Sequence, residues 1–145
     1  MNKGAQLKES TDDLMRLLSA SGDIDKYFEA IQGYSKTPEI SGYILLIIEQ
    51  KDLKKARVIE KAGIDRVYGY EIFRGKKIPG RDTLIRILLT MQVNVQNIQN
   101  ILKNTGYPIL YPKNMRDAII IFGIQNLLGI DRLNILLDDF GQKII

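Results

Sequence analysis

Cysteine and histidine are both absent from this chain of 145 residues. Their absence excludes disulfides, thiol nucleophiles, imidazole bases and nearly every zinc site. No apolar run approaches the ~18 residues of a membrane span, and residues 1–14 lack the apolar core of a signal peptide. No glycine-rich loop follows a strand and opens a helix, so nucleotide binding has no motif. We expect a cytoplasmic protein without cofactor or metal, and no residue pattern points to an enzyme.

Two pairs of adjacent carboxylates, Asp12-Asp13 and Asp138-Asp139, are the remaining candidates for acid and base chemistry. Neighbouring residues of a helix point about 100° apart, so neither pair forms an acid and base couple. We interpret both pairs as solvated faces or charges at helix ends.

The spacing of Gly63 and Gly75, twelve residues apart within residues 53–77, is the most informative pattern. It predicts a helix that begins near Lys54, a turn at Gly63, and a second helix that begins behind Asp65 and ends at Gly75. Gly63 supplies the backbone freedom that a sharp turn needs. Asp65 is placed to cap the second helix with its carboxylate. This is the pattern of a helix-turn-helix, which indicates a nucleic-acid reader.

Apolar residues of the two helices fall where the helices would face each other, and they predict a small shared core: Val58, Ile59, Ala62, Ile72 and Phe73. The second helix then points other side chains outward: Arg66, Val67, Tyr70 and Glu71.

These residues allow a family to be named. Residues 40–105 resemble the five-helix, lambda-repressor-like DNA-binding domain of the Xre family, the phage-repressor and Cro type. Several residues match its pattern: Leu53, Gly63, Ile64, Asp65, Tyr68, and Arg74-Gly75-Lys76. Three residues depart from it. Lys54 stands where a capping Ser or Thr is usual, Ile59 where a small Ala is usual, and Gly69 where a buried aliphatic residue is expected. From these departures we expect a looser helix crossing.

The resemblance implies binding of double-stranded DNA, with the helix at residues 65–74 in the major groove. By family geometry, three residues would contact base edges: Arg66, Val67 and Tyr70. Five others would contact phosphates: Lys54, Lys55, Arg57, Lys76 and Lys77. The implied function is a sequence-specific transcriptional regulator like those of bacteria and phages. The alternative is a protein interaction module that has kept the fold and lost specific DNA binding, as in related domains fused ahead of signalling modules.

The charge distribution favours the first interpretation. Residues 51–81 hold ten Lys or Arg against four Asp or Glu, whereas the whole chain has a net charge of only +4. A concentrated positive face attracts phosphates. The alternative is that these side chains form an ordinary solvated helix face.

Three segments are expected along the chain. Residues 1–36 predict an N-terminal extension with two short helices, TDDLMRLLSA and GDIDKYFEAIQ. Residues 37–106 contain the Xre-like domain, and residues 107–145 predict a C-terminal helical hairpin. The predicted fold class is all-α.

Residues 81–106 match residues 116–141 at an offset of 35 residues. The matches include Arg81 with Arg116, Asp82 with Asp117, and Gly106 with Gly141, and they predict two similar helix pairs. The alternative is coincidence among Ile-rich and Leu-rich helices. Within the second copy, residues 118–128 are apolar on more than one side, so they require cover from the same chain or from a second copy. Besides double-stranded DNA, the sequence therefore allows a second copy of the chain as a partner, in a homodimer.

Overall fold

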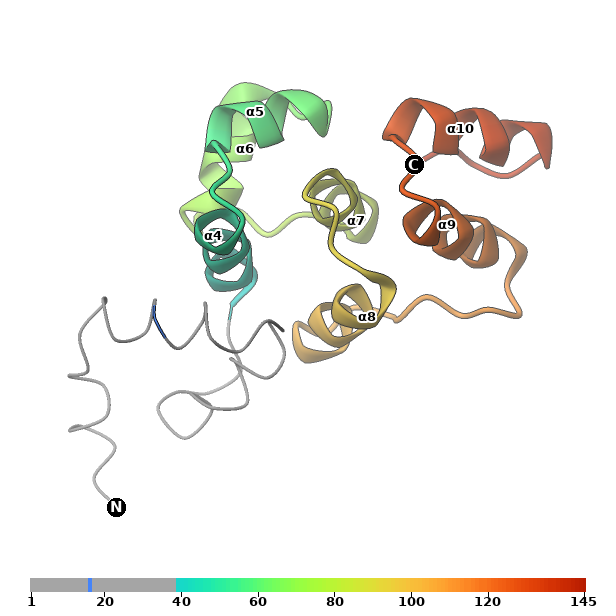
Figure 1. Cartoon of the computed structure of the whole chain (residues 1–145), viewed down its shortest axis with the longest axis horizontal. Helices are drawn as coiled ribbons and strands as arrows, with labels where there is room; N and C mark the ends of the chain where they lie inside the picture. Colours follow the sequence, from blue (N-terminus) through green and yellow to red (C-terminus); the bar gives the residue numbers. More distant parts are fainter. Residues whose placement is uncertain (1–15, 17–38) are drawn as a thin grey trace, which may run out of the picture.

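The computed structural model of the chain describes Arg16 and residues 39–145. The described segment is all-α, as predicted, and its seven helices are α4 (Ile40–Gln50), α5 (Lys55–Lys61), α6 (Arg66–Phe73), α7 (Arg81–Thr90), α8 (Val95–Asn104), α9 (Met115–Gln125) and α10 (Ile130–Asp139) (Figure 1). The two helices predicted within residues 1–36 lie outside the described residues, apart from Arg16. In the segment that is described, every helix is too short or too polar to cross a bilayer.

Local signals set the ends of α5 and α6 where the glycine spacing predicted them. Gly63 has a φ of 68°, in the left-handed region that glycine adopts without strain. The Asp65 carboxylate accepts a hydrogen bond of 3.1 Å from the Tyr68 N–H, so it caps α6. Lys54 is the N-cap of α5 and makes no side-chain capping bond. The helix-turn-helix therefore forms even though one of its two caps is missing.

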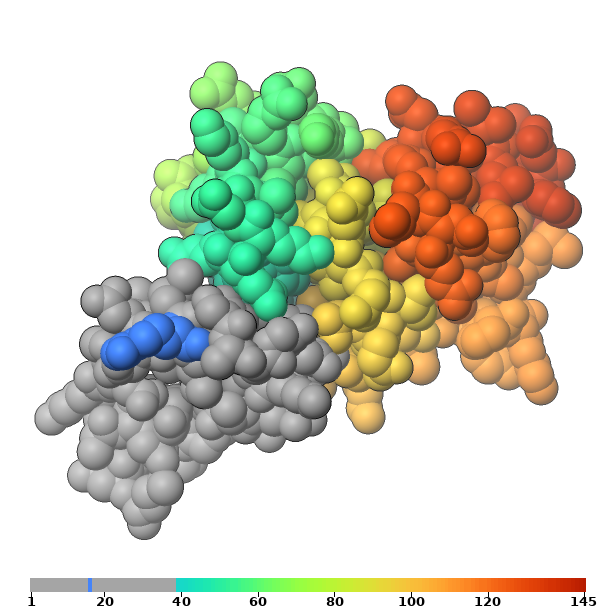
Figure 2. Space-filling view, viewed as in Figure 1, coloured from blue at the N-terminus to red at the C-terminus, as the bar shows by residue number. Residues whose placement is uncertain are grey.

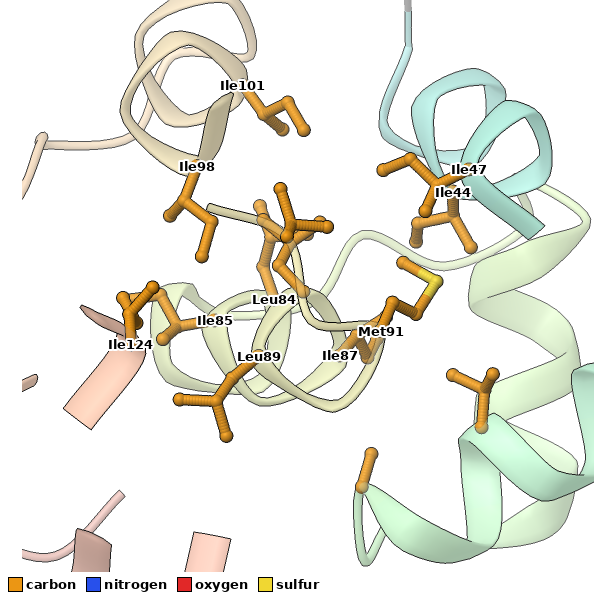
Figure 3. Close-up of a cluster of buried hydrophobic side chains, with 14 of the residues drawn as sticks. Ile44, Ile47, Leu84, Ile85, Ile87, Leu89, Met91, Ile98, Ile101 and Ile124 are labelled. Carbon is orange, nitrogen blue, oxygen red and sulfur yellow. The ribbon is translucent and has the colours of Figure 1, made fainter. Parts of the chain in front are cut away.

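The core is continuous from α4 to the end of the chain. Figure 3 shows α7 at its centre, with Ile44 and Ile47 of α4 near Met91 on one side and Ile124 of α9 near Ile85 on the other. These buried residues explain why the helix-turn-helix and the C-terminal hairpin do not separate into two cores: both pack on α7. Figure 2 shows the same order on the surface, with residues of α7 and α8 in yellow between α4–α6 in green and the hairpin in orange and red.

The predicted repeat is present in the backbone. The starts of α8 and α10 are 35 residues apart, and so are their ends. For α7 and α9, the helices that precede them, the ends are also 35 residues apart and the starts are 34 residues apart. Left-handed backbone recurs at the same offset, at Gln92 and Leu127 and again at Gly106 and Gly141. The sequence matches thus coincide with nearly equal helix bounds and with the same turn conformations.

The two copies are joined by reciprocal ion pairs. Arg81 donates to both carboxylate oxygens of Asp117, at 3.2 and 3.1 Å, and Arg116 donates to both oxygens of Asp82, at 3.2 and 2.9 Å. When residue i of one unit contacts residue j of the other and the converse also holds, the units are related by a two-fold rotation. The helix packing has the same reciprocity, because α8 packs against α9 and α10 packs against α7.

The backbone that follows each copy is also held in the same way. Gln99 exchanges two hydrogen bonds with the backbone of Leu110, both of 2.7 Å, and Asn134 does the same with Ile145, at 2.8 and 3.1 Å. Both of these apolar residues are buried. The predicted hairpin is thus an integral part of the core, and residues 107–114 connect the two halves of an approximate two-fold pair.

Candidate nucleic-acid interface

The contact between α5 and α6 depends on the complementary sizes of Ile59 and Gly69: the large side chain of one helix packs on the glycine of the other. Both residues are buried, and a methyl group added at Gly69 would lie 2.7 Å from Cγ2 of Ile59. The branched side chain of Ile59 therefore fills the volume that the missing side chain of Gly69 leaves. The expectation of a looser crossing is wrong at this point, because the two departures from the family pattern compensate each other.

The turn between the two helices is held by Arg86 of α7. Its Nε donates 2.8 Å to the Ala62 carbonyl, its Nη2 lies 3.5 Å from the Gly63 carbonyl, and its Nη1 donates 3.0 Å to the backbone oxygen of Ile145. One guanidinium thus links the helix-turn-helix to the end of the C-terminal hairpin. The residue pattern of α7 did not reveal this role, because Arg86 lies between buried Ile85 and Ile87 and the three carbonyls it binds are distant in sequence.

The outer face of α6 carries the predicted base-contact residues. Arg66 and Val67 are exposed at the start of the helix, with Val67 66% exposed, and Tyr70 is half-buried against the core. These three residues share one side of α6 because Arg66 and Val67 are four and three positions before Tyr70. Arg74 follows one turn later on the same side and is also exposed. Sequence reasoning treated Arg74 only as part of the family pattern, although its spacing from Tyr70 indicates a further contact residue.

The five predicted phosphate contacts are all exposed: Lys54, Lys55, Arg57, Lys76 and Lys77. Within the described segment none of them takes part in an ion pair, and the same holds for Arg66 and Arg74. Lys54, Lys55 and Arg57 lie at the start of α5, whereas Lys76 and Lys77 follow α6. The structure therefore places uncompensated positive charge at both ends of the helix-turn-helix, which is where a phosphate backbone would need it.

Two of the ten cations counted in residues 51–81 serve the fold instead. Arg81 binds Asp117, and the Lys51 ammonium donates 2.9 Å bonds to the carbonyls of Met91 and Gln92 at the end of α7. Cations are favourable at this end of a helix, where unpaired carbonyls gather. Partial burial lowers the pKa of Lys51 from its ordinary value. The charge open to a ligand thus comes from the other eight Lys and Arg of this segment.

Comparison of the chain with family models, with curated proteins and with solved structures gave no match.

Proposed function

We propose that this protein is a DNA-binding transcriptional regulator of the Xre type, with a lambda-repressor-like domain that inserts α6 into the major groove. Two observations carry the proposal together: Arg66 and Val67 are exposed on the outer face of α6, and cations without ion pairs within the described segment are exposed at the start of α5 and after α6. A helix of this kind presents its side chains to base edges while flanking cations neutralise phosphates.

Each contact has a chemical reason. The Arg66 guanidinium can donate two hydrogen bonds to O6 and N7 of guanine, and the Val67 methyl groups suit the methyl group of thymine. Tyr70 is half-buried, so only its outer part would be available to a base. Lys55 at the start of α5 and Lys76 after α6 would bind phosphates on either side of the groove and so fix the orientation of α6.

The second candidate is an interaction module that has lost specific DNA binding. The half-burial of Tyr70 favours it, because only two of the three predicted base-contact residues, Arg66 and Val67, are then exposed and the reading surface is small. The candidates differ in one measurable property. A regulator enriches a defined sequence from a random pool of duplexes, whereas an interaction module does not.

Fluorescence anisotropy of a labelled duplex at low salt tests the proposal. We expect binding that weakens steeply as salt rises, with a slope of log K against log salt of about −0.9 for each neutralised phosphate. Lys55→Ala and Lys76→Ala should each reduce that slope by about one and lower affinity similarly for all sequences. Lys103→Ala is the matched control, because Lys103 is exposed at the end of α8, outside the helix-turn-helix. Absence of duplex binding at low salt would contradict the proposal.

A further inference from the structure

The two-fold relation between the helix pairs identifies an exposed surface on α9 and α10. The equivalent surface on α7 and α8 is buried. In the first pair, Ile87, Met91 and Ile101 are at most 2% exposed, and Figure 3 shows α4 on the Met91 side of α7. At the offset of 35 residues, Phe122 corresponds to Ile87, Leu136 to Ile101, and the polar Asn126 to Met91. Phe122 is 51% exposed. Within the described segment, no helix has the position on α9 and α10 that α4 has on α7 and α8 (Figure 1).

This surface is hollowed. Side chains of both helices line a groove of about 450 Å³, which we call the α10 groove, and six of them matter here: Phe122, Leu128, Arg132, Ile135, Leu136 and Asp139. Ile135 is 63% exposed at its centre. A concave apolar surface bounded by charged residues is typical of a protein contact site.

The two charges that bound the groove are self-complementary. Arg132 and Asp139 are seven residues apart, which is about two turns, so they lie on the same side of α10. Their midpoint falls between Ile135 and Leu136. If two α10 helices meet antiparallel about a two-fold axis at that midpoint, each Arg132 lies opposite Asp139 of the other copy. Neither residue has an ion-pair partner within the described segment.

The helix dipole adds a second reason for this pairing. Arg132 lies in the first turn of α10 and Asp139 is its last residue. Each charge is therefore at the end of the helix where the dipole disfavours its sign. An antiparallel partner helix brings a carboxylate to the first end and a guanidinium to the second. Both unfavourable end charges are then compensated by the same contact.

We propose that the α10 groove is a homodimer interface, occupied by α10 of a second copy in antiparallel register. The contact is isologous: Ile135 and Leu136 meet at the axis, Phe122 packs at the side, and two Arg132–Asp139 pairs close the ends. This proposal does not depend on DNA binding, because it concerns only the surface of the C-terminal hairpin.

Sedimentation equilibrium of the full-length protein tests the interface and its register. The wild type should dimerise, and Arg132→Asp and Asp139→Arg should each raise the dimer Kd about tenfold or more, because each places like charges opposite each other twice. An equimolar mixture of these two variants should dimerise again, since every carboxylate of one then faces a guanidinium of the other. The double variant Arg132→Asp/Asp139→Arg should also dimerise, as the pairs are only reversed. Asp138→Arg is the matched control and should leave the Kd within about twofold of the wild type.

Three results would overturn the proposal. A wild type that stays monomeric at all concentrations would show that no second copy occupies the groove. A dimer whose Kd is insensitive to both single variants would lie on another surface. Loss of dimer in the single variants without recovery in the mixture or in the double variant would exclude the antiparallel register. Thermal melting of each variant by circular dichroism ensures that these results are obtained with folded chains.

Discussion

Arg81 and Asp117 form the more enclosed of the two ion pairs that join the repeated helix pairs. Their side chains are 21% and 12% exposed, and the Asp117 carboxylate also accepts a 2.9 Å bond from the Tyr111 N–H. Arg81 also donates from Nε and Nη2 to the carbonyls of Pro108 and Ile109, both at 2.9 Å. The pair thus fixes the segment between the copies as well as the copies themselves.

Arg81→Ala should lower the free energy of unfolding by about 2–4 kcal/mol, because it leaves a largely buried carboxylate without its charged partner. Arg116→Ala should cost less, about 1–2 kcal/mol, because its partner Asp82 is 34% exposed and keeps contact with water. Arg57→Ala, an exposed arginine without an ion pair within the described segment, is the control and should change stability little. Urea denaturation monitored by circular dichroism measures all three. Equal losses for Arg81 and Arg116 would contradict this assignment.

The complementary sizes of Ile59 and Gly69 can be tested by comparing Gly69→Ala with the same substitution at a glycine that has open space around it. Gly69→Ala should lower the free energy of unfolding by about 1–3 kcal/mol, because the new methyl group overlaps the Ile59 side chain. The same change at Gly42, inside α4 with no atom within 4 Å of an added methyl group, should be neutral or stabilising by up to about 1 kcal/mol.

The double variant Gly69→Ala/Ile59→Ala separates overlap from helix propensity, because Ile59→Ala removes Cγ1, Cγ2 and Cδ1, the three atoms that the added methyl group would meet. The double variant should lose less stability than the sum of the two single variants, since the overlap exists only when Ile59 is present. Thermal denaturation of the wild type, both single variants, the double variant and Gly42→Ala gives the comparison. If Gly69→Ala is as harmless as Gly42→Ala, the close contact of Ile59 with Gly69 does not limit this part of the core.

Arg86→Ala should loosen the turn of the helix-turn-helix. It removes the donor to the carbonyls of Ala62 and Gly63, and we expect the N–H groups of Gly63 and Ile64, which bond to Glu60 and Ile59, to exchange faster with solvent. The free energy of unfolding should fall by about 1–3 kcal/mol. Amide hydrogen exchange followed by NMR measures the local effect, with the N–H of Tyr68 in the next helix as an internal reference. Unchanged exchange at Gly63 and Ile64 would show that the guanidinium does not hold the turn.

The sequence predicted those parts of the fold that depend on local signals. Gly63 and Asp65 act within their own turn and cap, so the bounds of α5 and α6 followed from them. The offset of 35 residues likewise predicted two similar helix pairs, because Gly106 and Gly141 end them in the same backbone conformation. The all-α class followed from the same patterns.

Long-range relationships could not be predicted in this way. The pairing of Arg81 with Asp117 joins residues 36 positions apart, and nothing local distinguishes Arg81 from a cation that faces solvent. Lys51 was counted toward a phosphate-binding face for the same reason, although it binds carbonyls 40 and 41 residues away. Ile59 and Gly69 were two separate departures in sequence, and only their contact in space shows that they compensate. The predicted DNA contacts remain predictions: the structure places Arg66 and Val67 on an exposed face, and binding alone can test them.

Arg66→Ala should reduce specificity more than general affinity. Because a bidentate contact with guanine is worth about 1–3 kcal/mol, the variant should lose that amount on the selected site and far less on random DNA. Stability should barely change, since Arg66 is exposed at the first position of α6, where the helix dipole does not favour a cation. Lys55→Ala is the contrasting variant and should weaken binding to both kinds of duplex similarly. Selection of sites from a random pool with the wild type and both variants measures the difference. Equal enrichment by the wild type and Arg66→Ala, or no enriched site for the wild type, would favour an interaction module over a sequence-specific regulator.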